Sequence, residues 1–351
     1  MPDDTHLDAA PSAQSPSQRT WFKVLAIAIP SLLGLSGMVA LLIHQERLVI
    51  SGNPFAIRLQ EPPIYVEEPD HEISGQRYLF DPVLGWRNVP NYRANTFGHP
   101  MSINSRGLRD REYPYEKPSN TKRILVLGDS FTWGYGVGDQ DIFTEDLERR
   151  LAEADGDWEV INAGVSGWGT DQEYLFLKTE GLKYSPDIVI LAFYLRNDPI
   201  NNTGDVQYGL GKPCFTKGHT GEFTPPVLKP GVDYRQVQGL DPLKTTVPLI
   251  LGIEELCRKN HARMILMTFG AFGEPDPKNL EAVRWMARSL HYELRMAMTE
   301  TDLEVVDVDA AFAARNITTE SVWEGNRDRH WNAYGHSLVG EILHSYLSAE
   351  R

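Results

Sequence analysis

The chain has 351 residues, which is enough for one large domain or two of moderate size. Its 34 Lys and Arg stand against 48 Asp and Glu, so the formal net charge is −14 and a nucleic-acid partner is not expected. Hydrophobic residues at 41% and charged residues at 23% exclude wholesale disorder, collagen-like repeats and a membrane protein of many spans. Two cysteines cannot form a disulfide framework.

An apolar run of 20 residues without a charge, VLAIAIPSLLGLSGMVALLI, occupies residues 24–43. Its length suits a helix that crosses a bilayer, and the cations beside it weakly favour an N-terminus on the inner side. We therefore expect a disordered tail over residues 1–18, a single-pass anchor over 19–47, and the rest of the chain outside the cytoplasm, in the periplasm or the extracellular space. A cleaved signal peptide and a buried core helix are the alternatives.

Two segments separate the anchor from the main domain. Residues 48–75 contain four prolines and an acidic cluster, a composition typical of an extended tether. Residues 76–120 are rich in aromatic and turn residues and lack helical periodicity, so they predict a few short strands packed on the main domain as a small lead-in.

Residues 121–351 alternate short apolar runs with amphipathic stretches. Runs that are apolar on both faces are typical of parallel strands covered by helices on each side. They begin at Arg123, Trp158, Asp187, Ala262 and Leu303. The pattern predicts an α/β fold, a three-layer α/β/α sandwich with a central parallel sheet of about five strands, whose active site lies at the carboxyl ends of the strands.

One interval, residues 199–243, breaks this alternation with six prolines and seven glycines. An insertion of this length after the third strand predicts a lid over the site. It contains Cys214, while Cys257 falls in the next predicted helix. A bridge between them and two separate buried thiols remain equal alternatives.

Polar residues suited to ester chemistry follow three of the strands and precede the last helix. The first strand ends in GDSFTWG, which places Ser130 at a helix N-terminus, although a simple helix cap would read the same way. Gly167 and Asn197 follow the second and third strands and suit an oxyanion hole, with tight turns as their structural alternative. In NRDRHWNAYGH, Asp328 and His330 supply an acid and a base, whereas His336 is better explained by packing.

These motifs, in this order, resemble the SGNH or GDSL-like hydrolase superfamily, and the resemblance covers Lys122 to Arg351. It implies a flavodoxin-like sandwich in which Ser130 is the nucleophile, His330 the general base and Asp328 the orienting acid. The oxyanion donors would be the backbone N–H groups of Ser130 and Gly167 and the side-chain amide of Asn197.

Three positions depart from the family pattern. Phe131 replaces a common Leu, and Leu195 stands two residues before Asn197 where Gly is usual, which bears on substrate fit. Asp328 lies two residues before the histidine instead of three, with Glu324 as a substitute acid. The Asp-x-His-Trp form resembles periplasmic polysaccharide O-acetyltransferases within the superfamily.

The sequence thus predicts a serine esterase that cleaves an acyl, for example acetyl, ester of a small molecule or carbohydrate through an acyl-enzyme. The alternatives are an O-acyltransferase acting on a cell-surface polysaccharide with the same residues, and a non-catalytic glycan-binding module. Trp133, Trp168 and Tyr194 lie beside the motifs and suit stacking on sugar rings, or else packing. No metal-ligand spacing or phosphate-binding loop occurs among the motifs, so no metal or cofactor is expected.

Overall fold

The structure is a computed structural model. It describes residues 48–50, 57–59, 78–96, 98–204, 206–207, 210–212, 242–270, 277–297, 303–323 and 330–349. The chain divides into two units, residues 1–62 and 63–351. In the first, β1 (Leu48–Ile50) pairs antiparallel with β2 (Ile57–Leu59), within the segment expected to be a tether.

The expected tail, residues 1–18, and the apolar run, residues 24–43, lie outside the described residues. Among the helices that the structure does describe, none combines the length and the apolar character that a membrane crossing needs.

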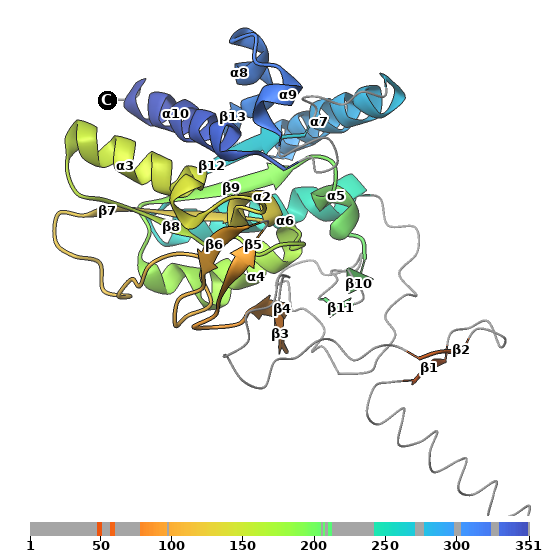
Figure 1. Ribbon diagram of the computed structural model, residues 1–351. Helices are drawn as coiled ribbons and strands as arrows, with labels where there is room; N and C mark the ends of the chain where they lie inside the picture. The colour runs from red at the N-terminus through yellow and green to blue at the C-terminus, as the bar shows by residue number, and fades with distance from the viewer. Residues whose placement is uncertain are drawn as a thin grey trace, which may run out of the picture. The chain divides into compact units, whose positions relative to one another are not determined.

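A parallel sheet of five strands forms the centre of the second unit (Figure 1) and confirms the predicted α/β fold class. Its order is β13-β12-β9-β7-β8. The strands are β7 (Lys122–Gly128), β8 (Trp158–Asn162), β9 (Ile188–Tyr194), β12 (Arg263–Phe269) and β13 (Glu304–Asp307). Because the connections run to opposite sides of β7, a crevice is expected where β7 and β9 end.

Helices cover both faces of the sheet (Figure 1). One face carries α3 (Phe143–Asp155), α8 (Val308–Ala314) and α10 (Ala333–Ala349), and the other carries α4 (Thr170–Thr179), α6 (Pro242–Lys259) and α7 (Pro277–Ala297). Along β7, Ile124 and Val126 enter the core on the first side, while Leu125 and Leu127 enter the core on the second. Burial on both sides explains why the strands are continuous apolar runs.

The lead-in forms two antiparallel hairpins. They are β3 (Tyr78–Asp81) with β4 (Gly85–Asn88), and β5 (Arg93–Thr96) with β6 (His99–Ser102). Trp86 from β4 and Tyr113 are buried in the same apolar cluster as helices α4 and α6. The lead-in therefore shares the main core.

Short elements connect these layers. They are α2 (Ser130–Trp133), α5 (Asp198–Asn201), α9 (Thr319–Val322), the hairpin β10 (Val206–Gln207) with β11 (Leu210–Gly211), and 3-10 turns at Asp139–Asp141 and Gly181–Tyr184. Within the predicted lid, residues 205, 208–209 and 213–241, Cys214 included, lie outside the described residues. Cys257 is buried in α6, and its burial raises the pKa of the thiol to about 12.

Candidate active site

Ser130 and His330, which are 200 positions apart in the chain, meet at the end of the sheet. Ser130 is the first residue of α2, directly beyond β7, and the Asp129 carboxylate caps this helix by accepting the Phe131 N–H at 2.9 Å. His330 Nε2 lies 2.7 Å from Ser130 Oγ. A hydroxyl in hydrogen-bond contact with an imidazole at a helix N-terminus is the arrangement that activates a serine.

Two aromatic rings pack against the His330 imidazole. The centroid of Phe131 lies 4.7 Å from that of His330, and the centroid of Tyr135 lies 4.6 Å from it. These contacts restrict the plane of the imidazole. The two acids considered from the sequence, Asp328 and Glu324, both lie outside the described residues.

Asp129 joins the segment that carries Ser130, residues 128–134, to the loop after β9. We call this segment the serine turn. Its Oδ2 accepts a hydrogen bond from the Asn197 side-chain amide at 2.9 Å. Burial raises the pKa of Asp129, while the hydrogen bonds from Asn197 and from the Phe131 N–H lower it. A primary amide has two N–H donors, so Asn197 retains a second one for another acceptor.

The turn after β8 approaches α2 closely. Asn162 Nδ2 donates to the Thr132 carbonyl at 2.7 Å, and a Cβ on Gly164 would lie 2.7 Å from the Thr132 carbonyl carbon. Gly164 therefore has to be a glycine for the two segments to touch. Gly167 lies in the same turn with a φ of 80°, a conformation that favours glycine.

The structure corrects two of the three aromatic residues assigned to substrate binding. Trp133 is 3% exposed and Trp168 is 1% exposed. The Trp133 ring lies under the Arg109 guanidinium, and Trp168 Nε1 donates to the Trp86 carbonyl at 3.0 Å. Both side chains face the interior, so they pack and present no ring face to a ligand. Tyr194 is half-buried and lines a pocket.

His336 is buried against the Phe143 end of α3. Its Nδ1 accepts the Phe143 N–H at 3.3 Å, and the two rings stack with centroids 6.0 Å apart. Burial, followed by the charge of Arg109, lowers the pKa of His336 to about 3. His336 therefore accepts a hydrogen bond at the N-terminus of α3 and is buried, as the packing explanation predicts.

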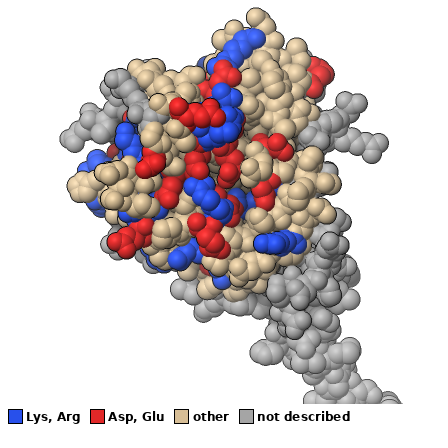
Figure 2. Space-filling model, turned by 60° about the vertical axis from the view of Figure 1, so that its left-hand side comes forward, with Lys and Arg blue, Asp and Glu red and all other residues tan. Residues whose placement is uncertain are grey.

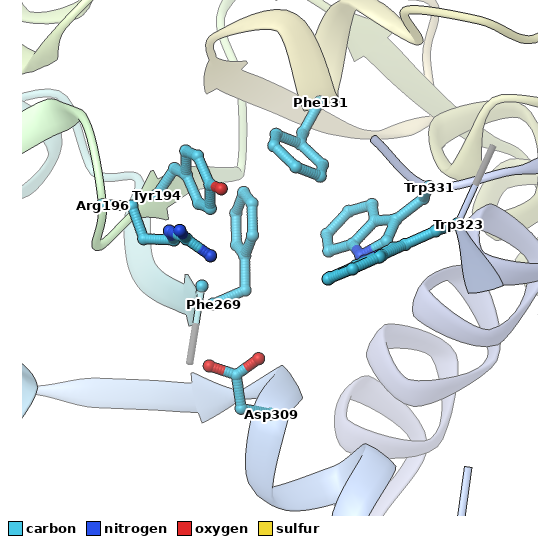
Figure 3. A pocket seen from close by; sticks show the side chains of 8 residues that line it. Phe131, Tyr194, Arg196, Phe269, Asp309, Trp323 and Trp331 are labelled. Carbon is cyan, nitrogen blue, oxygen red and sulfur yellow. The ribbon is translucent and has the colours of Figure 1, made fainter. Parts of the chain in front are cut away.

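A pocket of about 290 Å³, counted with its open mouth, is lined by chain neighbours of Ser130 and His330, and Figure 3 shows its lining side chains. Neither residue lines it, but the residues that follow them in the chain, Phe131 and Trp331, do. The complete lining is Phe131, Tyr194, Arg196, Phe269, Gly270, Asp309, Trp323 and Trp331. Leu195, by contrast, points into the main core, where it is 5% exposed.

Sequence reasoning missed Arg109, a buried guanidinium from the lead-in. It donates to the carbonyls of Gly134 at 2.6 Å, Trp133 at 3.0 Å and Val137 at 2.7 Å. It also donates to Asp139 Oδ1 at 2.9 Å. These carbonyls belong to the end of α2 and the loop that carries Tyr135. In the sequence Arg109 lies in the run NSRGLRD, residues 104–110, and nothing there indicates that its partners are main-chain carbonyls.

Carboxylates also collect behind the serine turn. Asp171, Glu173 and Asp198 are all 0% exposed. Burial raises the pKa of each, and the neighbouring carboxylates raise those of Glu173 and Asp198 further. Among the described residues, no group of three or more His, Cys, Asp and Glu side chains is arranged to hold a metal ion.

Residues 126–338 match the model of the GDSL-like lipase/acylhydrolase family. This match spans more than half of the chain, so the chain belongs to that family and is classed with enzymes that hydrolyse ester bonds. A search of the curated proteins found no match.

Solved structures with a similar fold are distant in sequence. The lipase/acylhydrolase from Enterococcus faecalis is 18% identical, with 65% of this chain and 96% of that chain covered and a TM-score of 0.41. The lipase Lip_vut3 from a goat rumen metagenome is 16% identical, with 64% and 96% covered and a TM-score of 0.43. A two-domain esterase active on acetylated mannans is 17% identical, and the match covers 65% of this chain but only 49% of that one, with a TM-score of 0.41.

Proposed function

We propose that this protein is a membrane-anchored serine esterase that acts outside the cytoplasm, with Ser130 as nucleophile and His330 as general base. The observation that carries the proposal is the 2.7 Å contact between Ser130 Oγ and His330 Nε2 at the start of α2. Family membership supports ester hydrolysis. The apolar run over residues 24–43 supports the anchor.

The proposed reaction proceeds through an acyl-enzyme. Ser130 Oγ attacks the ester carbonyl carbon while its proton passes to His330, and the carbonyl oxygen becomes an oxyanion. The N–H groups of Ser130 and Gly167 and the free N–H of Asn197 would stabilise this oxyanion. The bond to the alcohol oxygen then breaks, and His330 returns the proton to the alcohol. Water, activated by His330, cleaves the acyl-enzyme and releases the acid. Asp328 would orient the imidazole.

Covalent labelling with a fluorophosphonate probe tests the nucleophile. Wild-type protein is expected to be labelled, Ser130→Ala not at all, and His330→Ala much more slowly, because its serine lacks a base. Ser345→Ala, at an exposed position of α10, serves as the control and should label like wild type. Absence of labelling in the wild type would sink the serine mechanism.

Hydrolysis and acyl transfer would use the same residues, so the two reactions are distinguished by the products that they form. The purified protein is incubated with ethyl acetate and an oligosaccharide acceptor. Free acetate alone supports the esterase, whereas acetylated oligosaccharide would reassign the protein as an O-acyltransferase. Binding of the oligosaccharide without turnover of any ester would favour a glycan-binding module.

Cell fractionation tests the anchor and the compartment. The full-length chain is expected in the membrane fraction, with its catalytic domain accessible to protease added outside the cytoplasmic membrane. Recovery of a soluble chain that begins near residue 45 would instead identify a cleaved signal peptide.

A further inference from the structure

Asp129 is a buried carboxylate that contacts both sides of the proposed oxyanion hole. The residue is 0% exposed. Its Oδ1 accepts the Phe131 N–H at 2.9 Å, and its Oδ2 accepts a hydrogen bond from the Asn197 side-chain amide at 2.9 Å. The first bond holds the start of α2, which begins at Ser130, and the second holds Asn197 in the loop after β9.

We infer that Asp129 is a positioning residue, whose carboxylate fixes the Ser130 N–H and the Asn197 amide relative to each other as two donors to an oxyanion. The inference rests on the proposed esterase function and extends it to a residue that makes no contact with the substrate. Because Asp129 is fully buried, it can act on the reaction only through these neighbours.

The side chain of Asn197 does not make the bond that its local position favours. Asn197 is the N-cap residue of α5, where an asparagine side chain commonly accepts a hydrogen bond from a main-chain N–H of the first turn. No such bond forms here: the side-chain oxygen has no partner among the described residues, and the amide nitrogen donates to Asp129 instead. Helix capping therefore does not explain the placement of this side chain.

The Asp129 carboxylate also decides which way the Asn197 amide is turned. With the amide reversed, its oxygen would face a carboxylate oxygen, and two acceptors would be opposed without a proton between them. The NH₂ group therefore lies towards Asp129 and keeps one N–H for another acceptor. Asn197 is only half-buried, so a ligand has access to this side chain.

The backbone at Asn197 is fixed by separate hydrogen bonds. The Asn197 N–H donates to the Tyr194 carbonyl at 3.2 Å, and the Tyr194 N–H donates to Asp198 Oδ2 at 2.7 Å. These bonds close the loop after β9 into a turn, so Asp129 has only the side chain left to hold. A donor that is in place before the substrate arrives needs no reorganisation during the reaction, which is the basis of oxyanion stabilisation.

A carboxylate suits this position because it accepts hydrogen bonds on both oxygens. An asparagine in place of Asp129 has one oxygen and one NH₂ group. If the oxygen keeps the Phe131 N–H, the NH₂ group faces the NH₂ group of Asn197, and two donors are opposed. Because asparagine caps helices about as well as aspartate, Asp129→Asn keeps the cap of α2 and breaks the contact with Asn197.

Hydrolysis of p-nitrophenyl acetate by the full-length protein tests the inference. Asp129→Asn is expected to lower kcat by about tenfold with little change in KM, because a misdirected donor weakens transition-state stabilisation more than substrate binding. In an Asn197→Ala background the same change should lower kcat by no more than about twofold, since the donor that Asp129 positions is already gone.

Asp307→Asn is the matched control for Asp129→Asn. Asp307 also follows a strand of the sheet and caps a helix, α8, by accepting the Ala310 N–H at 2.9 Å. This change should leave both kcat and KM unaltered. Equal losses of kcat from Asp129→Asn with and without Asn197 would overturn the inference.

An exchanged pair separates positioning from folding. Asp129→Asn combined with Asn197→Asp restores a hydrogen bond between the two side chains with donor and acceptor reversed, but it leaves a carboxylate where the oxyanion forms. The melting temperature is expected to lie closer to wild type than that of Asp129→Asn alone, with a kcat that is no higher. Recovery of kcat together with the melting temperature would contradict the positioning role.

A measurement without turnover separates the inference from the proposed function. Wild-type protein that hydrolyses no ester and takes no fluorophosphonate label would count against the esterase. The Asn197 side-chain amide is then followed by NMR, with its signal identified through Asn197→Ala. Slow exchange of this amide with solvent in wild type and fast exchange in Asp129→Asn support positioning by Asp129, whereas equal exchange rates in the two proteins would refute it.

Discussion

At the scale of single residues, Glu173 is a buried acid that lacks a hydrogen-bond partner among the described residues. It lies in the first turn of α4, is 0% exposed, and neither carboxyl oxygen has a hydrogen-bond partner in the described part of the chain. Burial, and then the charges of Asp129 and Asp171, raise its pKa well above the ordinary value. Burial and the neighbouring charges therefore both favour the neutral, protonated form of the side chain.

Glu173→Gln is expected to stabilise the protein at pH 8. In wild type the unfolded glutamate loses its proton above about pH 4.3, so folding at higher pH must take up a proton and stability falls as pH rises. Glutamine resembles the neutral acid and removes this cost. We expect a gain of about 1–3 kcal/mol at pH 8 that shrinks towards pH 4.5, measured by urea unfolding across pH.

The exposed Glu153, whose side chain is 67% accessible, provides the matched control as Glu153→Gln and should show no such trend. A Glu173→Gln protein that is less stable than wild type at every pH would show that the carboxylate is charged and compensated.

The sequence identified some site residues and missed others for a physical reason. The contact of Ser130 with His330 could be predicted because each lies at a strand or helix end, and the ends of parallel strands share one edge. For Trp133 and Trp168 burial supports the packing alternative over sugar stacking, and the sequence could not decide because nearness to a motif does not reveal which way a side chain points. The position of Arg196 in the pocket lining was not predicted, because it depends on the course of several loops.

At the scale of elements, α2 is a four-residue helix that cannot hold its own geometry. Arg109 supplies the missing constraint by binding the carbonyls of Trp133, Gly134 and Val137. The loop that it fixes carries Tyr135, whose ring packs against His330. The lead-in therefore reaches the serine turn and the imidazole through one guanidinium.

Arg109→Ala is expected to lower kcat by about tenfold or more with a smaller change in KM, since the lost contacts position His330 more than they bind substrate. The rate of fluorophosphonate labelling should fall in parallel, measured well below the melting temperature. Arg109→Lys should rescue little, because one ammonium cannot replace the planar fork of a guanidinium.

The control for Arg109 is Arg315→Ala, which breaks a surface pair with Glu341. Unchanged labelling in Arg109→Ala, together with a lowered melting temperature, would assign Arg109 to stability alone.

A buried ion pair connects the predicted lid to the main domain. Lys212, the residue after β11, pairs with Asp171 of α4, and both side chains are 0% exposed. Lys212 Nζ also donates to the Asn201 carbonyl in α5 at 2.7 Å. The Lys212 ammonium thus connects the end of β11 with helices α4 and α5.

Lys212→Met is expected to destabilise the protein by about 3–5 kcal/mol, because it leaves the Asp171 carboxyl buried without its cation. Adding Asp171→Asn should recover part of the loss, since the remaining group is neutral. Lys259→Met, at an exposed pair with Glu255, should cost no more than about 0.5 kcal/mol. The urea midpoints measure all three, and equal midpoints for Lys212→Met and wild type would contradict the prediction.

Regular elements were easier to predict than connections. The five strands begin within one residue of the predicted starts, because burial on both faces imposes an unbroken apolar run. The hairpin of β1 and β2 was not expected in a Pro-rich segment. Short pairings of this kind lack the periodicity that longer strands show.

At the scale of the whole molecule, the net charge of −14 does not gather into one patch on the face shown in Figure 2. Lys and Arg side chains alternate there with Asp and Glu. Among the described residues, opposite charges also form short-range pairs such as Arg111 with Glu148 and Lys117 with Asp187. Interspersed charges keep a surface soluble without creating a long-range field of one sign.

The lead-in and the sheet share one core, with Trp86 at the junction. Trp86 is 1% exposed, its Nε1 donates to the Ser166 carbonyl at 3.3 Å, and its own carbonyl accepts from Trp168 Nε1. These bonds fasten β4 to the turn that contains Gly167. Residues 78–113 should consequently unfold together with the sheet and not as a separate layer.

Trp86→Ala is expected to cost about 3–5 kcal/mol, because it removes a large buried side chain and leaves a cavity between two segments. The unfolding of this variant should remain a single transition, with the melting temperature from near-UV circular dichroism equal to the temperature at which esterase activity is lost. Trp285→Ala, at an exposed position, should stay within about 0.5 kcal/mol of wild type. Two separated transitions in Trp86→Ala, with activity surviving the first, would show that the lead-in is dispensable to the site.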